Sequence, residues 1–277
     1  MKTNTYHYLF HDEDLIQHLN DCEFGDNELS LNQSEDIIQT SHELMTEGFG
    51  IYKLLSETEF EELSTYITKH VKTLLQQHQT VLEDFTLENY HRHVKDDSIH
   101  YAVSSWAMSP DVISPLFDIV QKRVEKLLSN PLDIKVINHR GVMGKFIGFR
   151  IIRPHTTDHS PYHRDAWLPY WQNTVNVWIP ISGFSQGNTI CLLPKSHLLN
   201  DSEILKTKKG AVINGKSYHV PAAIAIKKPF KHIKPVLHAG EALLFSPYIL
   251  HGNGENNHPD QTRVSIELRF CKKNIEL

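Results

Sequence analysis

Thr174-Val175-Asn176-Val177-Trp178-Ile179 has the β-branched and aromatic composition of a core β-strand. Similar short segments, separated by turns that contain glycine or proline, occupy the chain from Asn130-Pro131 onward. We expect strands over residues 133–138, 145–153, 161–166, 174–181, 189–193, 241–246 and 262–271. Many short strands of this kind are typical of a sandwich or a jelly roll.

The part of the chain before residue 130 shows helical signals instead. Ser56-Glu57-Thr58-Glu59 has the form of a capping box, and the helix predicted after it has one apolar face, made of Phe60, Leu63, Ile67, Val71, Leu74 and Leu75. Other helices are expected to begin at Ser34 and at Ser109-Pro110 or Ser114-Pro115. A helical part ahead of a run of strands predicts an α+β fold with helices on the outside of a barrel-like core.

Length and composition limit the class of protein. The 277 residues suffice for one large domain or two small ones. We expect one domain over 1–277, with a mainly helical part at 1–130 and a β core at 131–277. A Lys-rich insertion at 198–239 interrupts that core, and long segments of this kind are usually lids or disordered loops.

Charge, hydropathy and cysteine content exclude several functions. A net charge of −5 argues against general nucleic-acid binding, and no apolar run approaches the roughly 20 residues of a membrane span. The first residues lack the apolar run of a signal peptide. Three cysteines without metal-like spacing give no disulfide framework, which favours a reducing, cytoplasmic setting.

The stretch Tyr162-His163-Arg164-Asp165 places an imidazole and a carboxylate two residues apart. Residues i and i+2 of a strand share a face, so His163 and Asp165 can converge on one point. His251, in Tyr248-Ile249-Leu250-His251-Gly252-Asn253, is a fitting third group. Two histidines and one carboxylate form the facial triad of non-haem Fe(II) oxygenases.

The pattern His-x-Asp/Glu is weak by itself, because the chain has 19 histidines and the pattern begins at His11, His163 and His258. The first of these lies in an acidic stretch without a strand pattern. The third contains Pro259 and follows two asparagines, which predicts a loop. Only His163 stands among strand-like segments.

A cationic clamp for a co-substrate is expected close to the third ligand. Arg263 follows His251 by twelve residues, and strand alternation places it on one face with Ser265. A guanidinium grips a carboxylate in bidentate fashion, and a hydroxyl adds a donor. Arg269 lies on the same face and is an alternative clamp, and a surface salt bridge is the alternative role for Arg263.

Five segments in order resemble the phytanoyl-CoA dioxygenase family. They are Tyr162-His163-Arg164-Asp165, Asn176-Val177-Trp178-Ile179-Pro180-Ile181, the stretch from Gly187 to His197 that ends in Pro194-Lys195-Ser196-His197, Gly240-Glu241-Ala242-Leu243-Leu244-Phe245, and His251-Gly252-Asn253-Gly254 with Arg263. The resemblance covers about residues 145–270. It implies a double-stranded β-helix (a jelly-roll or cupin-like core) and an oxygenase that uses Fe(II), 2-oxoglutarate and O2.

The resemblance also implies roles for single residues. His163, Asp165 and His251 would bind iron, and Arg263 with Ser265 would bind the distal carboxylate of 2-oxoglutarate. Further positions toward the co-substrate would be Asn176 and Thr189, whereas His197 would belong to a structural turn. Two departures from the family pattern are Lys195, which replaces a glycine, and a His251-to-Arg263 spacing one residue longer than expected.

The expected reaction is hydroxylation of an unactivated C–H of a small polar metabolite, with decarboxylation of 2-oxoglutarate to succinate. Trp167, Trp171 and Arg150 are candidate substrate contacts, although packing explains the two tryptophans equally well. Lysines of residues 200–240 could meet an anionic group of the substrate; the alternatives are that they are simply solvated or that they pair with the acidic N-terminal half. The alternatives are a protein or peptide hydroxylase and a non-catalytic β-helix binding protein, and the oligomeric state stays open.

Overall fold

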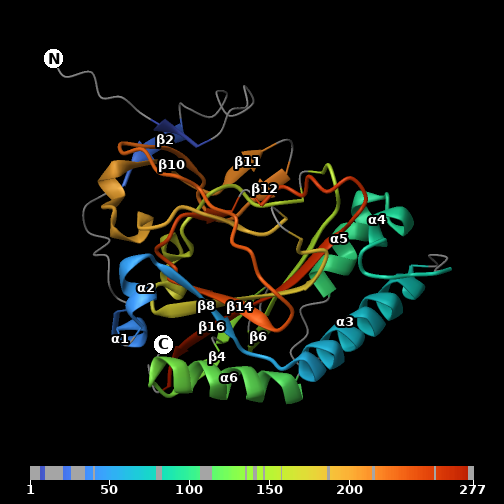
Figure 1. Ribbon diagram of the computed structural model, residues 1–277. Helices are drawn as coiled ribbons and strands as arrows, with labels where there is room; N and C mark the ends of the chain where they lie inside the picture. The colour runs from blue at the N-terminus through green and yellow to red at the C-terminus, as the bar shows by residue number, and fades with distance from the viewer. Residues whose placement is uncertain are drawn as a thin grey trace.

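The computed structural model describes residues 7–9, 21–25, 35–39, 41–78, 83–106, 114–134, 136–139, 142–145, 147–156, 158–185, 188–213, 216–252 and 254–273. Figure 1 shows the arrangement: a curved antiparallel sheet, helices below it and at its two sides, and smaller strand pairs above it. The α+β prediction is confirmed. Three positions from the sequence analysis lie outside the described residues. They are the predicted helix starts at Ser34 and Pro110, and His11 of the first His-x-Glu pattern.

The main sheet has six strands, and its long central strands carry the site. The order is β3-β14-β8-β16-β4, and β7 also pairs with β16. These strands are β3 (Phe49–Lys53), β4 (Leu132–Ile134), β7 (Ile147–Ile152), β8 (Thr174–Ser182), β14 (Glu241–Phe245) and β16 (Arg263–Lys272). Every residue of β8 is buried, because helices cover one face of the sheet and the barrel interior covers the other.

The helices form the outer layer. They are α1 (Glu35–Ile38), α2 (His42–Thr46), α3 (Glu57–Gln77), α4 (Tyr90–His93), α5 (Asp97–Trp106) and α6 (Ser114–Leu128). The predicted capping box is present at the start of α3, where the Ser56 and Glu59 side chains each accept from the other's backbone N–H. Leu63, Ile67, Val71 and Leu75 of α3 enter the same core cluster as Val175, Val177 and Ile179 of β8. Helical spacing of apolar residues therefore decides which side of the sheet this helix covers.

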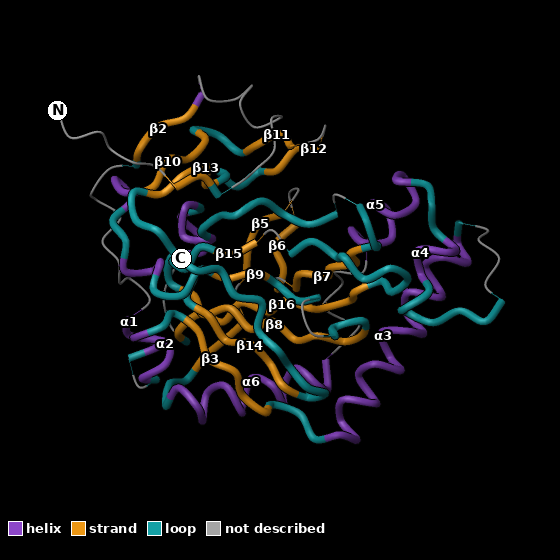
Figure 2. Tube along the Cα trace, turned by 45° about the horizontal axis from the view of Figure 1, so that its top comes forward, coloured by secondary structure: helices purple, strands orange, loops and turns teal. Residues whose placement is uncertain are grey.

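The remaining strands form smaller sheets, which lie between the top and the centre of Figure 2. A four-stranded sheet has the order β1-β13-β10-β2, and the other strands form three pairs. The strands are β1 (His7–Tyr8), β2 (Cys22–Phe24), β10 (Ile204–Thr207) and β13 (Ala223–Ile226), with the pairs β11 (Ala211–Ile213) and β12 (Lys216–Tyr218), β9 (Cys191–Leu192) and β15 (His251–Gly252), and β5 (Val136–His139) and β6 (Val142–Lys145).

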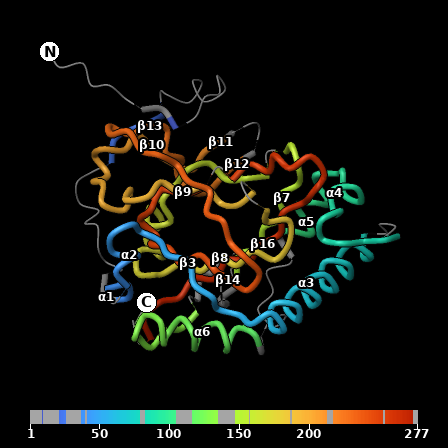
Figure 3. Tube along the Cα trace, in the orientation of Figure 1, coloured from blue at the N-terminus to red at the C-terminus, as the bar shows by residue number. Residues whose placement is uncertain are grey.

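The insertion at 198–239 is therefore largely structured. Its strands β10 and β13 pair with each other and with two N-terminal strands, so chain segments distant in sequence lie side by side (Figure 3). No comparable strand pattern is visible in the residues of the insertion, because these strands are short and their register shifts between Leu205 and Lys206. Among the described residues no helix is both long and apolar enough to cross a membrane.

The strand predicted over 161–166 is wrong. His163 makes a single antiparallel bridge with His251, and the chain then turns into a short 3-10 helix over Asp165–Trp167. Pro169 follows and starts a second such turn, Pro169–Trp171. The prolines at 161 and 169 limit how far regular pairing can extend. The predicted strand over 133–138 is likewise divided between β4 and β5.

Candidate active site

His163, Asp165 and His251 come together in the barrel interior. The backbones of His163 and His251 exchange two hydrogen bonds of 2.9 and 3.0 Å, which fixes the two imidazoles side by side. The Nε2 atoms of His163 and His251 lie 3.4 and 3.9 Å from Oδ1 of Asp165. All three residues are buried. The convergence expected from strand alternation is thus achieved by a bridge and a turn.

Each imidazole is oriented by a carbonyl two residues earlier in the chain. The Nδ1 of His163 lies 2.7 Å from the Pro161 carbonyl, and the Nδ1 of His251 lies 3.0 Å from the Ile249 carbonyl. With Nδ1–H donating to a carbonyl, the lone pair of each Nε2 points toward Asp165. Burial, followed by the neighbouring His163, lowers the pKa of His251 to about 4, so this ring is neutral at neutral pH.

The carboxylate of Asp165 is held by one of its oxygens only. Its Oδ2 accepts hydrogen bonds from Arg269 at 2.7 and 3.1 Å and from the Asn176 amide at 2.8 Å. Burial opposes ionisation, but Arg269 and the two histidines outweigh it and hold the pKa of Asp165 well below its usual value. The ionised Oδ1 therefore faces the two Nε2 atoms.

These three atoms fit a divalent metal ion. The set has two imidazole nitrogens and one carboxylate oxygen, all within 4.8 Å of one another, and all three donors come from buried residues. Neutral imidazoles together with a carboxylate suit iron, and three protein ligands leave further coordination positions open. The outer atoms of the ligands are already bonded to the protein, as ordered metal sites require.

Arg263 is a buried guanidinium without an ion pair to any carboxylate in the described part of the chain. Its two terminal nitrogens donate to the carbonyls of Thr189 (2.9 Å) and Gly254 (2.7 Å), and its Nε has no hydrogen-bond partner there. Burial lowers its pKa to about 10, which leaves it cationic at neutral pH. A carboxylate is the ligand that such a group lacks.

The surroundings of Arg263 are shaped for its position. A Cβ at Gly254 would lie 3.0 Å from a terminal nitrogen of Arg263, so glycine there leaves room for the guanidinium. Ser265 is buried on the same face of β16. The alternative clamp, Arg269, is bonded to Asp165 and therefore belongs to the cluster of His163, Asp165 and His251.

The remaining predicted residues lie as follows. Asn176 contacts the cluster through Asp165, and Thr189 contacts Arg263 through its carbonyl while its hydroxyl donates to the Pro235 carbonyl. The Trp171 ring stacks on the Arg269 guanidinium with 4.6 Å to the ring centroid. The indole N–H of Trp167 instead donates to Asp201.

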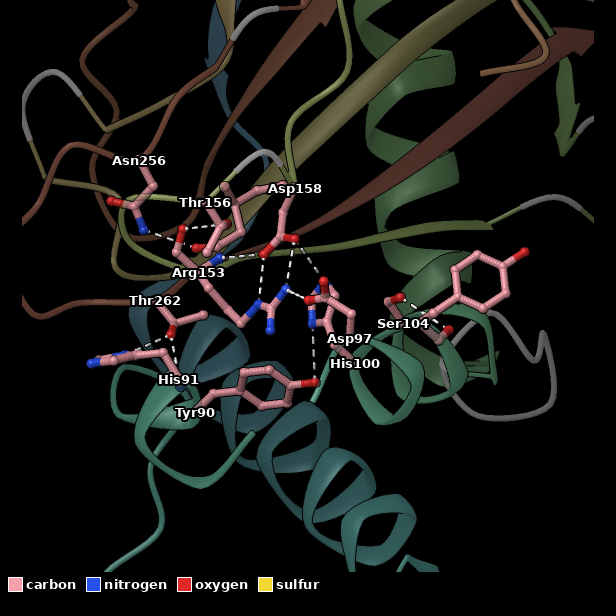
Figure 4. Close-up of polar contacts among 12 residues, drawn as sticks. Tyr90, His91, Asp97, His100, Ser104, Arg153, Thr156, Asp158, Asn256 and Thr262 are labelled. Atoms are coloured by element: carbon pink, nitrogen blue, oxygen red, sulfur yellow. Dashed lines mark hydrogen bonds and ion pairs between the residues drawn. The ribbon is translucent and has the colours of Figure 1, made fainter. Parts of the chain in front are cut away.

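Arg150, within β7, and Arg153, just after its end, have different surroundings. The side chain of Arg150 is 47% exposed and its Nε lies 3.7 Å from Glu267. Arg153 is buried and is bonded to Asp158 and Asp97, in the polar cluster that Figure 4 shows between α5 and the end of β7. Of the pair, Arg150 is therefore the one available to a ligand.

Two buried charged residues near the site were not found by sequence patterns. Arg164, between two predicted ligands, points away from them and bonds to Asp201, Ser196 and Leu199. Glu267 shares the inner face of β16 with Arg263 and Ser265. Strand alternation continued beyond Ser265 would have found Glu267, whereas nothing local marks Arg164 as buried.

The turn that contains His197 is structural. Its Nε2 lies 3.0 Å from the Met45 carbonyl, and the preceding Ser196 hydroxyl accepts from the Leu250 N–H. Several insertion lysines have partners close by, which are Asp201 for Lys206, Ser202 for Lys227, Glu203 for Lys228 and Glu255 for Lys234.

An antiparallel cupin-like core with a buried His-Asp-His cluster defines the class of mononuclear non-haem iron oxygenases. The family model for phytanoyl-CoA dioxygenase (PhyH) matches residues 51–265, so the chain belongs to this family. The protein is accordingly a 2-oxoglutarate-dependent non-haem iron dioxygenase that uses Fe(II), 2-oxoglutarate and O2.

Three solved structures are similar to this chain. EctD from S. alaskensis, in its apoform, is 12% identical with a TM-score of 0.50, over 84% of this chain and 76% of that one. AviO1 from Streptomyces viridochromogenes Tue57 is 13% identical with a TM-score of 0.49, over 90% and 98% of the two chains. The epimerase SnoN, in complex with Fe3+, alpha ketoglutarate and nogalamycin RO, is 13% identical with a TM-score of 0.47, over 84% and 82%. A search of curated protein sequences found no match.

Proposed function

We propose that the enzyme hydroxylates an unactivated C–H of a small polar metabolite while 2-oxoglutarate is decarboxylated to succinate. In this proposal His163, Asp165 and His251 bind the iron, and Arg263 with Ser265 binds the distal carboxylate of 2-oxoglutarate. The observation that supports it is that the outer and inner atoms of each ligand side chain have different partners. The outer atom of each side chain is bonded to the protein, and the inner atoms, two Nε2 and one Oδ1, face one another.

Bound iron, with 2-oxoglutarate and O2, supplies the oxidising power needed to break a C–H bond. The protein's part is to hold and orient. Arg269 and Asn176 occupy Oδ2 of Asp165, so that only Oδ1 is available to the metal. A monodentate carboxylate leaves positions for the co-substrate and O2. Arg263 keeps its cation in a buried site, where its attraction to a carboxylate is only weakly screened.

A small polar substrate is supported by the charged side chains at the inner face of β16 and β7. Arg150 is half-exposed and close to Glu267, and Tyr170 and Trp171 lie next to Arg269 and Asp165. Arg150 and Trp171 are thus our candidates for contact with substrate. Trp167 is bonded to buried Asp201, which supports a packing role for that residue.

The metal assignment is tested by calorimetric titration of the protein with Mn(II) and then with 2-oxoglutarate. His163→Ala is expected to weaken Mn(II) binding by more than about a hundredfold, since loss of residues that merely support ligands already costs 10–100-fold. His258→Ala is the matched control, because His258 belongs to the other described His-x-Asp pattern and lies in a loop. Equal Mn(II) affinity of His163→Ala and wild type would overturn the assignment.

The reaction is tested by succinate formation. A metabolite library and a peptide library are supplied separately with Fe(II), 2-oxoglutarate and O2. We expect small polar compounds to raise succinate formation above the basal rate and the hydroxylated product to gain 16 mass units, roughly the mass of one oxygen atom. Stimulation by peptides alone would replace this proposal by the peptide hydroxylase.

A further inference from the structure

Glu267 lies in the middle of the inner face of β16. Arg263 and Ser265 precede it on this face, and Arg269 follows it. Its cross-strand partners are Trp178 of β8 and Gly148 of β7, and the glycine has no side chain to cover the carboxylate. Glu267 therefore stands between the proposed carboxylate clamp and the arginine that holds Asp165.

The carboxylate of Glu267 is buried but poorly bonded. Its side chain is 11% exposed, and the nearest cationic nitrogens among the described residues are Nη1 of Arg269 at 3.5 Å and Nε of Arg150 at 3.7 Å. Hydrogen bonds between a cation and a carboxylate normally measure about 2.7–2.9 Å. A buried carboxylate without short donors costs folding free energy, so the site is incomplete as it stands.

Neither Arg269 nor Arg150 is placed to give Glu267 a short hydrogen bond. Arg269 uses two nitrogens on Asp165 and is stacked against Trp171, which fixes its position. Arg150 is half-exposed, and its neighbour across the ladder is Ser265. A group that approaches from the side of Arg150 can take its place at Glu267 and leave the guanidinium of Arg150 to bind an anion.

We propose that the substrate carries a protonated nitrogen that binds Glu267 and an anionic group that binds Arg150, so that it is a zwitterion of the amino-acid class. This inference rests on the proposed function, because it places the substrate beside the same ligand cluster. A primary or secondary ammonium supplies the short donors that Glu267 lacks. Glu267 is then a substrate-binding residue that sets specificity.

The test uses the Fe(II)-loaded enzyme and a library of matched pairs, in which each amino acid is accompanied by the hydroxy acid of the same skeleton. Succinate formation is measured as a function of compound concentration. For wild type we expect amino acids to be the stimulating members, with a KM at least about tenfold below that of the paired hydroxy acid. Glu267→Gln should abolish this discrimination, and Arg150→Gln should raise KM for both members of a pair.

A separate measurement distinguishes this role from mere support of Arg269. Mn(II) and 2-oxoglutarate affinities of Glu267→Gln should stay within about twofold of wild type. Glu61→Gln, on the exposed side of α3, is the control. If hydroxy acids or neutral compounds stimulate equally, or if nothing in the library stimulates, the zwitterion inference is wrong. Failure of wild type to bind Mn(II) would instead overturn the proposed function itself.

Discussion

The protein has two polar clusters, one around His163 inside the barrel and one around Arg153 at its edge. They differ in whether their donors and acceptors bond to one another. In the cluster of Figure 4, Arg153 donates to both oxygens of Asp158, and His100 lies between Asp158 and the Tyr90 hydroxyl. Donors and acceptors there satisfy one another. In the His163 cluster, by contrast, the inner atoms face each other at 3.4 and 3.9 Å with no donor between them.

The arginines show the same contrast. Arg153 is buried against a buried carboxylate, and Arg263 is buried against carbonyl oxygens with its Nε without a partner among the described residues. Burying a charge without a countercharge lowers stability unless a ligand supplies one. The closed cluster around Arg153 therefore contributes to the fold, whereas the open cluster around His163 and Arg263 leaves atoms without partners among the described residues.

The largest effect on folding is expected from Arg153→Met. It leaves the buried carboxylate of Asp158 without its main partner, and breaking a buried pair costs about 3–5 kcal/mol. The measurement is urea unfolding of the metal-free protein. Arg92→Met, which removes an exposed partner of Asp260, should have a far smaller effect. Similar losses for the two variants would contradict the closed-cluster interpretation.

The same substitution at Arg263 should act on ligand binding. Arg263→Met removes the proposed partner of the distal carboxylate, and 2-oxoglutarate binding should weaken by about 2–5 kcal/mol, on the order of 30-fold or more. Calorimetry on Mn(II)-loaded protein measures this, and the Mn(II) affinity should be unchanged. An unaltered 2-oxoglutarate affinity would show that another cation is the clamp.

Low pH should reduce the stability of the metal-free protein through His251. Its pKa is about 4 in the folded protein against 6.5 for the free side chain, so below pH 6.5 the unfolded chain binds a proton that the folded chain does not. Stability of the metal-free protein therefore falls as the pH drops from 6.5 to about 4, by about 3 kcal/mol from this residue. Urea unfolding at several pH values should give a flatter profile for His251→Gln. Parallel profiles would contradict this assignment.

The sequence was sufficient for the α+β class, the capped helix α3 and the grouping of His163, Asp165 and His251, because each has a local pattern or a resemblance behind it. It was insufficient for the path of the chain at 161–166, since a single bridge and a 3-10 turn leave no periodicity. Arg164 was beyond reach for a different reason. Its burial depends on Asp201 and on carbonyls more than thirty residues away.

The smallest predicted effect concerns the turn that supports the open cluster. Lys195 has a left-handed backbone with φ of +65°, where the family pattern has glycine. A side chain in this region costs about 1–2 kcal/mol, and glycine's greater freedom in the unfolded chain offsets roughly half of that. The lost contact between Lys195 and Glu47 is exposed and contributes little.

Lys195→Gly should therefore stabilise the protein by about 0.5–1 kcal/mol in urea unfolding, whereas Lys195→Ala keeps the backbone cost and should not. Mn(II) binding should be the same in both variants, because the bond from the Leu250 N–H to the Ser196 hydroxyl, which links the turn to the residue before His251, does not involve the Lys195 side chain. A glycine variant no more stable than the alanine variant would mean that the left-handed conformation at Lys195 carries no cost in this turn.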